Sequence, residues 1–145
     1  MYRRGLVPGV RPGATGTEVV KMHALARLML GPTLRNIQSS WVKEGPKLAQ
    51  HLLTCGANDL GGTLINESIS TSAGAPYGQL VPPRELRRMI REAGRVPAQR
   101  NTTYDLLKVY REEDEESPLD TIGNPEARFG SYQRLTASAE FRFRK

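Results

Sequence analysis

Apolar residues recur at helical spacing in three stretches, which predict helices over residues 17–30, 46–55 and 83–93. The first stripe contains Val19, Met22, Ala26 and Met29, widened by Leu25 and Leu28. Gly31-Pro32 ends this first helix, and a proline opens each of the other two, where it suits the first turn. An apolar stripe of this kind is typical of a helix that packs on a core.

Short punctuated stretches between the helices predict strands at residues 36–41, 57–63 and 96–100. The first two flank the second helix and form one β-α-β unit with a short crossover. A short helical stretch is expected over 64–70, and residues 71–82 are predicted to be a flexible connection. Helices laid over short strands in this order indicate an α/β fold, as part of a parallel sheet or barrel.

The two ends of the chain lack sustained periodicity. Residues 1–16 mix Gly, Pro and Arg without an acidic residue, which indicates an irregular leader. Its arginines leave organellar targeting open, although the stretch lacks the amphipathic pattern of a transit peptide. Residues 112–116 are consecutive acids that repel one another, so we expect low order from about residue 111. The predicted organisation is therefore a leader over 1–16, a folded part over 17–110 and an acidic, poorly ordered tail over 111–145.

Charge is distributed unevenly along the 145 residues. Residues 1–100 carry a net charge of +8 and residues 101–145 carry −2, within a total of +6. One face of the third predicted helix carries Arg84, Arg87, Arg88 and Arg91. Because such a face can grip phosphates, a small RNA- or polyanion-binding module is an alternative function. No interleaved aromatic residues accompany the arginines, so a solvated outer face is the favoured interpretation and nucleic acid is not the expected partner.

The single cysteine, Cys55, excludes several kinds of site. One thiol cannot form an intramolecular disulfide framework, a Cys-rich zinc site or the cradle of an iron–sulfur cluster. The chain also lacks GxGxxG, GxxxxGKS/T and HExxH motifs, so nothing supports a nucleotidase or a hydrolase. No apolar run approaches the roughly 20 residues of a membrane span. We therefore expect a cytoplasmic protein without membrane contact.

Polar residues gather where the predicted strands end, which is where α/β folds bind ligands. Gly61 and Gly62 permit a close approach that a Cβ would block, and Asp59 accepts from hydroxyl or amino groups. Arg100 can clamp an anion with two donors, and Glu67 can bind an amino group or move a proton. The ordinary alternatives are a tight turn for the glycines and a helix cap for Asp59. None of these residues is assigned as catalytic or as a metal ligand. The candidate cofactor- or substrate-binding residues are Gln38, Ser40, Asn58, Asp59, Gly61, Gly62, Thr63, Glu67, Gln99 and Arg100.

Several stretches carry a family pattern in order and spacing. The most specific is Asn58-Asp59-Leu60-Gly61-Gly62-Thr63, and the supporting ones are HALARLML at 23–30, NIQSSWVK at 36–43, SAGA at 72–75 and AQRNTTY at 98–104. Over about residues 18–107 the chain resembles the radical S-adenosylmethionine enzymes of deazaflavin biosynthesis, and among them the 4-hydroxybenzyl-transferring half of FO synthase. Part of the pattern is shared with the related menaquinone (futalosine) pathway enzymes, a fragment of which is a second alternative.

The resemblance implies the later strands and helices of a TIM-like radical SAM barrel. In the parent family a 4Fe-4S cluster and S-adenosyl-L-methionine generate a radical that fragments tyrosine, and the 4-hydroxybenzyl unit is joined to 5-amino-6-(D-ribitylamino)uracil. The ten candidate residues would line that cavity.

The family's CxxxCxxC motif is absent, because Cys55 stands alone. The resemblance therefore implies a C-terminal fragment of such a transferase, which by itself binds neither cluster nor cofactor and is inactive. A complete barrel needs about 200 residues or more. A separately encoded N-terminal barrel half is accordingly a candidate partner, and the fragment alone should expose an unpaired sheet edge.

Overall fold

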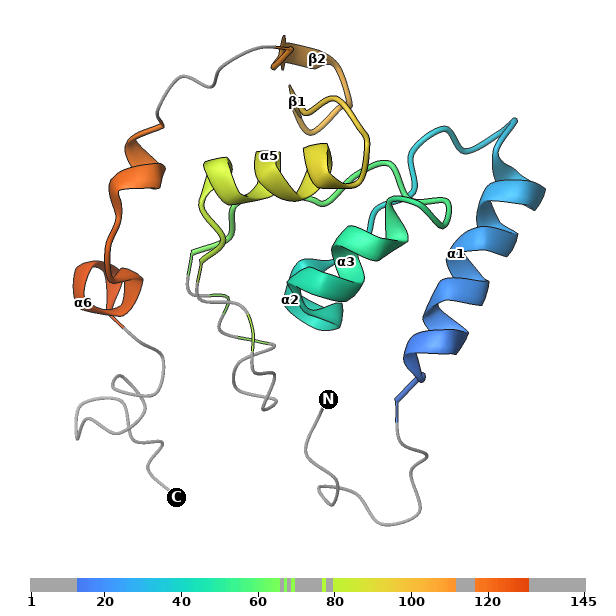
Figure 1. Cartoon of the computed structure of the whole chain (residues 1–145), viewed down its shortest axis with the longest axis horizontal. Coiled ribbons are helices and arrows are strands. Elements are labelled where there is room, and N and C mark those ends of the chain that lie inside the picture. The colour runs from blue at the N-terminus through green and yellow to red at the C-terminus, as the bar shows by residue number, and fades with distance from the viewer. Residues whose placement is uncertain are drawn as a thin grey trace, which may run out of the picture.

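The computed structural model describes residues 13–65, 67, 69, 77, 80–111 and 117–130. Within these ranges the helices are α1 (Gly16–Leu30), α2 (Trp41–Glu44), α3 (Pro46–Leu52), α5 (Pro83–Glu92) and α6 (Pro125–Phe129), with a 3-10 helix, η1 (Pro118–Thr121). The strands are β1 (Ala98–Arg100) and β2 (Leu106–Val109). In Figure 1, α1 lies at one end of the molecule, α3 and α5 lie in the middle, and α6 lies at the other end.

The three predicted helices are confirmed as α1, α3 and α5. α1 begins with a capping box: the Glu18 backbone N–H donates to the Thr15 hydroxyl at 3.3 Å, and the Thr15 N–H donates to the Glu18 carboxylate at 2.8 Å. α3 and α5 each begin with a proline, whose fixed φ suits the first helical turn. The short α2 was not predicted, because four residues carry too little periodicity to be recognised.

The hydrophobic core lies where α2, α3 and α5 meet. Trp41 is part of it and also donates from its indole N–H to the Gly62 carbonyl at 3.1 Å, which ties the core to the glycine pair. Ser39 is buried nearby, and its hydroxyl donates to the Ala49 carbonyl at 3.1 Å, so this buried polar group is satisfied. The buried apolar side chains are Trp41, Val42, Ala49, Leu52, Leu53, Ala57, Leu60, Val81, Leu86 and Met89.

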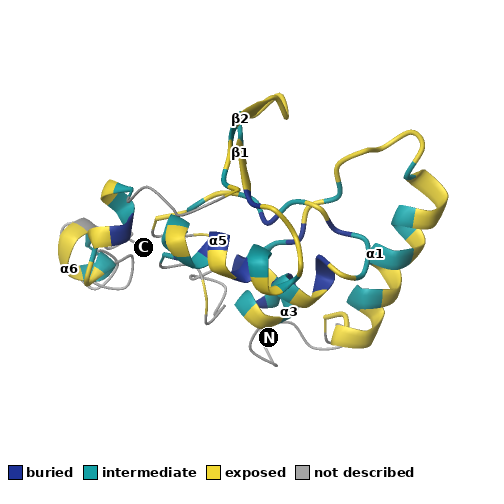
Figure 2. Ribbon diagram, turned by 45° about the horizontal axis from the view of Figure 1, so that its top comes forward, coloured by how far each residue is buried: buried dark blue, intermediate teal, exposed yellow. Residues whose placement is uncertain are grey.

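α1 packs on this core through one side only. Val19 and Val20 contact the core, but no residue of α1 is fully buried. The other side, which carries most of the predicted apolar stripe, is exposed (Figure 2). The stripe is therefore real as a sequence pattern, but only part of it faces the core of this chain.

Two of the predicted strands meet in a parallel bridge between Gln38 and Asp59. Ser39 donates its backbone N–H to the Asp59 carbonyl at 2.8 Å, and Asn58 donates to the Ile37 carbonyl at 3.0 Å. Because α2 and α3 connect the two bridged segments, the β-α-β unit is present in a minimal form. The structure is thus a small mixed arrangement of helices and short strands, compatible with a partial α/β fold.

The third predicted strand is present as β1, but its pairing differs from the expected parallel sheet. β1 runs antiparallel to β2, with Ala98 opposite Val109 and Arg100 opposite Leu106. The expected parallel continuation is therefore wrong for this strand, which forms a hairpin with the next segment of the chain. β2 was missed because Leu106 and Leu107 are adjacent and both exposed, so the strand lacks the alternation that marks a half-buried edge.

Other expected segments fall partly outside the described residues. Leu64 and Ile65 are not helical, and most of the remaining stretch to residue 70 lies outside the described parts of the chain, as do most of residues 71–82. The leader up to residue 12 and the acidic run at 112–116 also lie outside them.

The expected low order of the tail is wrong for residues 117–130, which form η1 and α6. Asp120 of η1 accepts from the backbone N–H of Arg84 at 2.6 Å and from that of Ser117 at 2.9 Å. It also forms a buried ion pair with Arg87 at 3.1 Å, in which the Arg87 and Asp120 side chains are 7% and 3% exposed. Sequence periodicity cannot reveal this contact, because the two residues lie 33 positions apart.

Replacing Asp120 with Asn is expected to release η1 from α5. Position 120 then carries an amide, which lacks the negative charge that pairs with the buried Arg87. Because η1 can detach while the rest of the chain stays folded, the loss of stability cannot exceed the free energy of docking η1, about 1–3 kcal/mol. Hydrogen exchange over residues 117–121 should accelerate about tenfold, which corresponds to ~1.4 kcal/mol. Asn124→Ala removes the α6 cap, an Ala127 N–H bond of 3.0 Å, and serves as the control that leaves η1 docked. Unchanged exchange in Asp120→Asn would show that the ion pair does not hold η1.

The same contact makes η1 sensitive to acid. Burial alone would raise the pKa of Asp120, but hydrogen bonds from the Arg84 and Ser117 backbones and from Arg87 lower it below its ordinary value of 3.8. The stabilisation of docked η1 by ionised Asp120 is therefore complete above that ordinary pKa and is lost as the pH falls below it. The protection factors of residues 117–121, which correct for the pH dependence of intrinsic amide exchange, should fall below about pH 4 in the native chain, and Asp120→Asn should flatten this profile.

Candidate functional site

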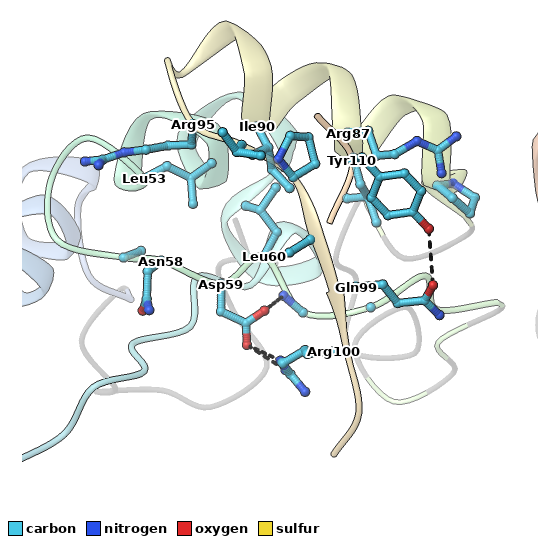
Figure 3. A pocket seen from close by; sticks show the side chains of 18 of the residues that line it. Leu53, Asn58, Asp59, Leu60, Arg87, Ile90, Arg95, Gln99, Arg100 and Tyr110 are labelled. Carbon is cyan, nitrogen blue, oxygen red and sulfur yellow. Dashed lines mark hydrogen bonds and ion pairs between the residues drawn. The ribbon is translucent and has the colours of Figure 1, made fainter. Parts of the chain in front are cut away.

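A cleft of about 1030 Å³ lies between the segment after α3, helix α5 and the β1–β2 hairpin. Residues 56–63 form one wall, residues 95–100 form another, and Tyr104 and Tyr110 also line it. Figure 3 shows Asp59 and Arg100 pointing toward one another, with Gln99 and Tyr110 meeting in the same way further along. The candidate residues that line the cleft are Asn58, Asp59, Gly61, Gly62, Thr63, Gln99 and Arg100.

Asp59 and Arg100 form an ion pair on the wall of the cleft. Arg100 donates to Asp59 Oδ2 from Nη2 at 2.6 Å and from Nε at 3.0 Å, and the Gly61 N–H donates to Asp59 Oδ1 at 2.9 Å. The Arg100 and Asp59 side chains are 26% and 11% exposed. The hydrogen bonds that Arg100 donates to Asp59 raise the pKa of Arg100 above its ordinary value, so the guanidinium keeps its charge. Both residues were predicted from the sequence to bind a ligand, and in the structure they bind each other.

Tyr104 holds Arg100 from another side. The guanidinium carbon lies 4.2 Å from the centroid of the Tyr104 ring, a cation–π contact, and Nη1 donates to the Asn101 carbonyl at 2.9 Å. Tyr104 has a φ of 68°, which is uncommon for a bulky residue. The turn that imposes it is held by Asn101 Oδ1, which accepts from the Thr103 and Asp105 N–H groups at 2.9 Å. Sequence analysis missed Tyr104, although it lies in the AQRNTTY stretch.

Asn58 connects structural elements through its side chain. Its Oδ1 accepts from Arg27 Nη2 at 2.9 Å and from the Ile37 N–H at 2.8 Å, while its Nδ2 donates to the Arg35 carbonyl at 3.2 Å. Arg27 also donates from Nε to the Gly56 carbonyl at 2.8 Å. These bonds tie α1 to both bridged segments. The amide that sequence analysis assigned to a ligand is therefore already engaged at the edge of the cleft.

The two glycines of the specific motif have different roles. Gly61 has a φ of +74°, and a Cβ there would lie 2.4 Å from Gln38 Nε2, so this position needs glycine for its turn. Gly62 meets nothing within 4 Å of a Cβ position, and it is exposed at the rim. Asp59 accepts from the N–H two residues ahead and thus stabilises this turn. The tight-turn alternative is confirmed for Gly61, whereas the helix-cap alternative for Asp59 is wrong.

Tyr110 is a second cleft residue that sequence analysis missed. Its hydroxyl donates to Gln99 Oε1 at 3.2 Å, and its backbone N–H donates to the Pro97 carbonyl at 2.9 Å. The Arg87 guanidinium carbon lies 5.0 Å from the centroid of its ring. Tyr110 therefore connects β1 to α5 across the cleft and fixes the side-chain oxygen of Gln99.

The remaining candidates occupy different places. Thr63 lines the cleft beside the glycines. Gln38 lies behind Gly61, where its amide limits the space for any side chain at that position. Ser40 precedes α2, and its carbonyl accepts from the N–H groups of Lys43 and Glu44 at 3.1 and 2.9 Å. Among the described residues, Gln38, Ser40 and Glu67 are outside the lining of the cleft.

The arginines of α5 do not form an open basic face. Arg87 is buried, which contradicts the expected solvated position. Arg88 forms ion pairs with Glu85 at 2.5 Å and with Glu92, and its hydrogen bond lowers the pKa of Glu85. Much of the positive charge that a polyanion would need is thus paired within the chain.

The described parts of the chain lack two kinds of feature. They contain no group of three or more His, Cys, Asp or Glu residues that is placed to hold a metal ion. The Cys55 Sγ lies 3.6 Å from His51 Nε2 and 3.7 Å from Thr54 Oγ1. None of the helices in these parts has the length and apolar character needed to cross a membrane.

A family model described as the CofH/MqnC C-terminal region matches residues 4–113. The chain belongs to this family. The match includes α1 to β2 and both partners of the Asp59–Arg100 pair, whereas η1 and α6 follow it. The resemblance recognised over residues 18–107 is confirmed, and the CofH/MqnC region extends beyond that stretch at both ends.

Curated relatives of this CofH/MqnC region are named 5-amino-6-(D-ribitylamino)uracil–L-tyrosine 4-hydroxyphenyl transferase. The Methanopyrus kandleri protein is 56% identical over 110 residues, which cover 76% of this chain and 29% of that protein. The Archaeoglobus fulgidus protein is 56% identical over 95 residues, which cover 66% of this chain and 28% of that protein. The Methanothermobacter thermautotrophicus protein is 51% identical over 104 residues, which cover 72% of this chain and 28% of that protein. The chain therefore spans less than a third of these relatives.

Proposed function

We propose that this chain forms the C-terminal wall of the cavity in a radical S-adenosylmethionine transferase of deazaflavin biosynthesis. The complete enzyme would transfer the 4-hydroxybenzyl group of tyrosine to 5-amino-6-(D-ribitylamino)uracil. The observation that carries the proposal is the cleft, whose Asp59, Gly61 and Arg100 lie inside the family match and beside the Gln38–Asp59 parallel bridge. Ligands of parallel α/β folds bind beyond the carboxyl ends of strands, which is the position of Asp59 and Gly61, whereas Arg100 reaches the same cleft from the antiparallel strand β1.

The bridged segments would be later strands of a TIM-like barrel, with α3 between them. Both bridged segments carry their polar residues where the strand ends, and this is where the cavity residues of barrel enzymes lie. The antiparallel β1–β2 hairpin would then close the cavity beside the last of these strands.

The chain's own residues supply shape and polar anchoring. The lone Cys55 does not fit a 4Fe-4S cluster, which needs several thiolates. In the complete enzyme that cluster and S-adenosylmethionine supply the radical chemistry. Arg100, held by Asp59 and Tyr104, places guanidinium N–H donors at a fixed position on the cavity wall. A preorganised donor of this kind orients a carboxylate or carbonyl oxygen without reorganising, and tyrosine and the aminouracil both carry such oxygens.

The alternatives have less support. An RNA- or polyanion-binding face conflicts with the burial of Arg87 and the pairing of Arg88. The family description includes MqnC as well as CofH, but the relatives compared above carry the transferase name. The transferase is therefore the better supported function.

An exchange of regions tests this function. The matched region of the Methanopyrus kandleri protein is replaced by residues 4–113 of this chain, and the purified, anaerobically reconstituted chimaera is assayed for the adduct of tyrosine with the aminouracil. We expect activity within about tenfold of the unmodified protein, a barrier change of no more than ~1.4 kcal/mol. The 145-residue chain alone should show neither product nor the visible absorbance of a cluster.

Two controls make the result decisive. The unmodified relative sets the reference rate, and the same protein without the matched region sets the background. A chimaera that folds and carries its cluster but forms no product would overturn the proposal, as would a cluster assembled by the chain alone.

A further inference from the structure

The exposed side of α1 is an apolar surface that no other described part of the chain covers. Met22, Leu25, Leu28 and Met29 are 66%, 54%, 79% and 75% exposed. Val19 and Val20, on the opposite side of the same helix, pack on the core. A helix that is apolar on two sides is typical of an element buried between two layers, and only one of those layers is present among the described residues.

An open sheet edge lies in the segment that follows α1 and is bonded to it through Arg27. The segment around Gln38 pairs on one side with the segment around Asp59, and within the described residues no strand pairs with its other side. Arg27 binds α1 to this segment, because its Nη1 donates to the Arg35 carbonyl at 3.0 Å and its Nη2 donates to Asn58 at 2.9 Å. The apolar side of α1 and this open edge, which Arg27 connects through the core-facing side of α1, together make the uncovered boundary of the described residues, and α1 itself lies at one end of the molecule (Figure 1).

The relatives indicate what covers this boundary. The matched region is the C-terminal part of the family proteins, and it accounts for only 29% of the Methanopyrus kandleri protein. α1 begins at Gly16, close to the start of the match at residue 4, so the polypeptide that precedes the match is its neighbour in sequence order. In α/β folds, consecutive elements usually lie side by side.

We propose that the α1 surface, made of Met22, Leu25, Leu28 and Met29, together with the open edge at residues 37–39, is the seat of the preceding barrel portion of the transferase. The identity of this occupant rests on the function proposed above. A strand of that portion pairs with the edge, and its apolar side chains cover the α1 surface. α1 then becomes an internal element, which explains why its apolar stripe is wider than the core of this chain requires.

The test compares the same substitutions in two contexts. Leu25→Gln/Leu28→Gln is introduced into the full chain and into the chimaera described above, since glutamine favours helix but does not suit an apolar interface. We expect the double substitution to lower the Tm of the chimaera by about 5–10 °C and to change that of the chain by less than about 2 °C. Lys47→Gln on α3 is the matched control, because Lys47 is exposed and lies away from the surface.

Several outcomes would overturn the proposal. Equal, small Tm changes in both contexts would show that nothing covers the α1 surface in the transferase. A chain that is dimeric in solution and becomes monomeric on Leu25→Gln/Leu28→Gln, with no effect on the chimaera, would assign the surface to a second copy.

A second measurement removes the dependence on the chimaera. If the chimaera does not fold, the tagged full chain is co-expressed with the part of the Methanopyrus kandleri protein that precedes the match. Capture of that part should fall about tenfold with Leu25→Gln/Leu28→Gln, which corresponds to ~1.4 kcal/mol, and should be unchanged with Lys47→Gln. Unchanged capture by the double variant would contradict the proposal. Neither readout requires product formation, so a stable but inactive complex would refute the proposed function and leave this interface intact.

Discussion

Gly56→Ala should lower the free energy of unfolding of this chain by about 2–4 kcal/mol, because backbone strain and a steric clash add up at one position. Gly56 has a φ of +117°, which L residues rarely adopt. A Cβ there would lie 2.6 Å from the His23 carbonyl oxygen and 2.9 Å from Arg27 Cβ. Both neighbours belong to α1, so the helix must shift, and the 2.8 Å bond from Arg27 Nε to the Gly56 carbonyl shifts with it.

Two other glycines separate strain from clash. Gly94 has a φ of +72° with nothing within 4 Å of a Cβ position, so Gly94→Ala measures the strain alone, about 1 kcal/mol. Gly62 has open space and no positive φ, so Gly62→Ala should stay within about 0.5 kcal/mol of the native chain. Chemical denaturation of the three variants checks the order. If Gly56→Ala lowered the free energy of unfolding no more than Gly94→Ala does, α1 would be able to shift away from the added Cβ without loss of stability, and the predicted clash would be refuted.

The Asp59–Arg100 pair carries the second large effect, which a double-mutant cycle measures. Asp59→Asn and Arg100→Met each leave one half-buried partner without its counter-charge, and their combination removes both charges. We expect a coupling free energy of about 1–2 kcal/mol, below that of a fully buried pair because the Arg100 side chain is 26% exposed. In the chimaera, Asp59→Asn should reduce product formation by about tenfold to a hundredfold, because a wall displaced by about 1 Å misplaces the substrate.

The exposed Glu85–Arg88 pair on α5 provides the matched control cycle. Its side chains are 38% and 54% exposed, so water screens the attraction and the coupling should be much smaller. Equal coupling in the two cycles would mean that the cleft gives Asp59 and Arg100 no special environment. A chimaera unaffected by Asp59→Asn would remove the pair from the proposed cavity.

Local signals in the sequence were sufficient for α1, α3 and α5. Pro46 and Pro83 begin α3 and α5 as predicted, since a proline in the first helical turn needs no partner for its missing N–H. The β-α-β unit followed from the spacing of its parts. β2 was not predictable, because its pairing with β1, rather than any alternation of its own residues, makes it a strand.

The candidate site was predicted as a set of residues, but not as a set of contacts. Asp59 and Arg100 were both chosen for their chemistry, yet the sequence cannot show that an acid and a base 41 residues apart bind each other. Asn58 was chosen in the same way, and its side-chain amide forms hydrogen bonds with Arg27 of α1 and with the backbone of residues 35–37. Tyr104 and Tyr110 contribute through their positions beside arginines, which no periodicity reports.

The sequence by itself determined the family, the three main helices and the short list of polar residues around the glycine pair, because these depend on residue types at local spacing. Tertiary structure alone decided which of those polar groups line the cleft and which bind one another. It also decided that Asp120 anchors η1 on Arg87 and that one side of α1 stays exposed. The physical reason is that charge pairing and burial depend on distances between segments far apart in the chain.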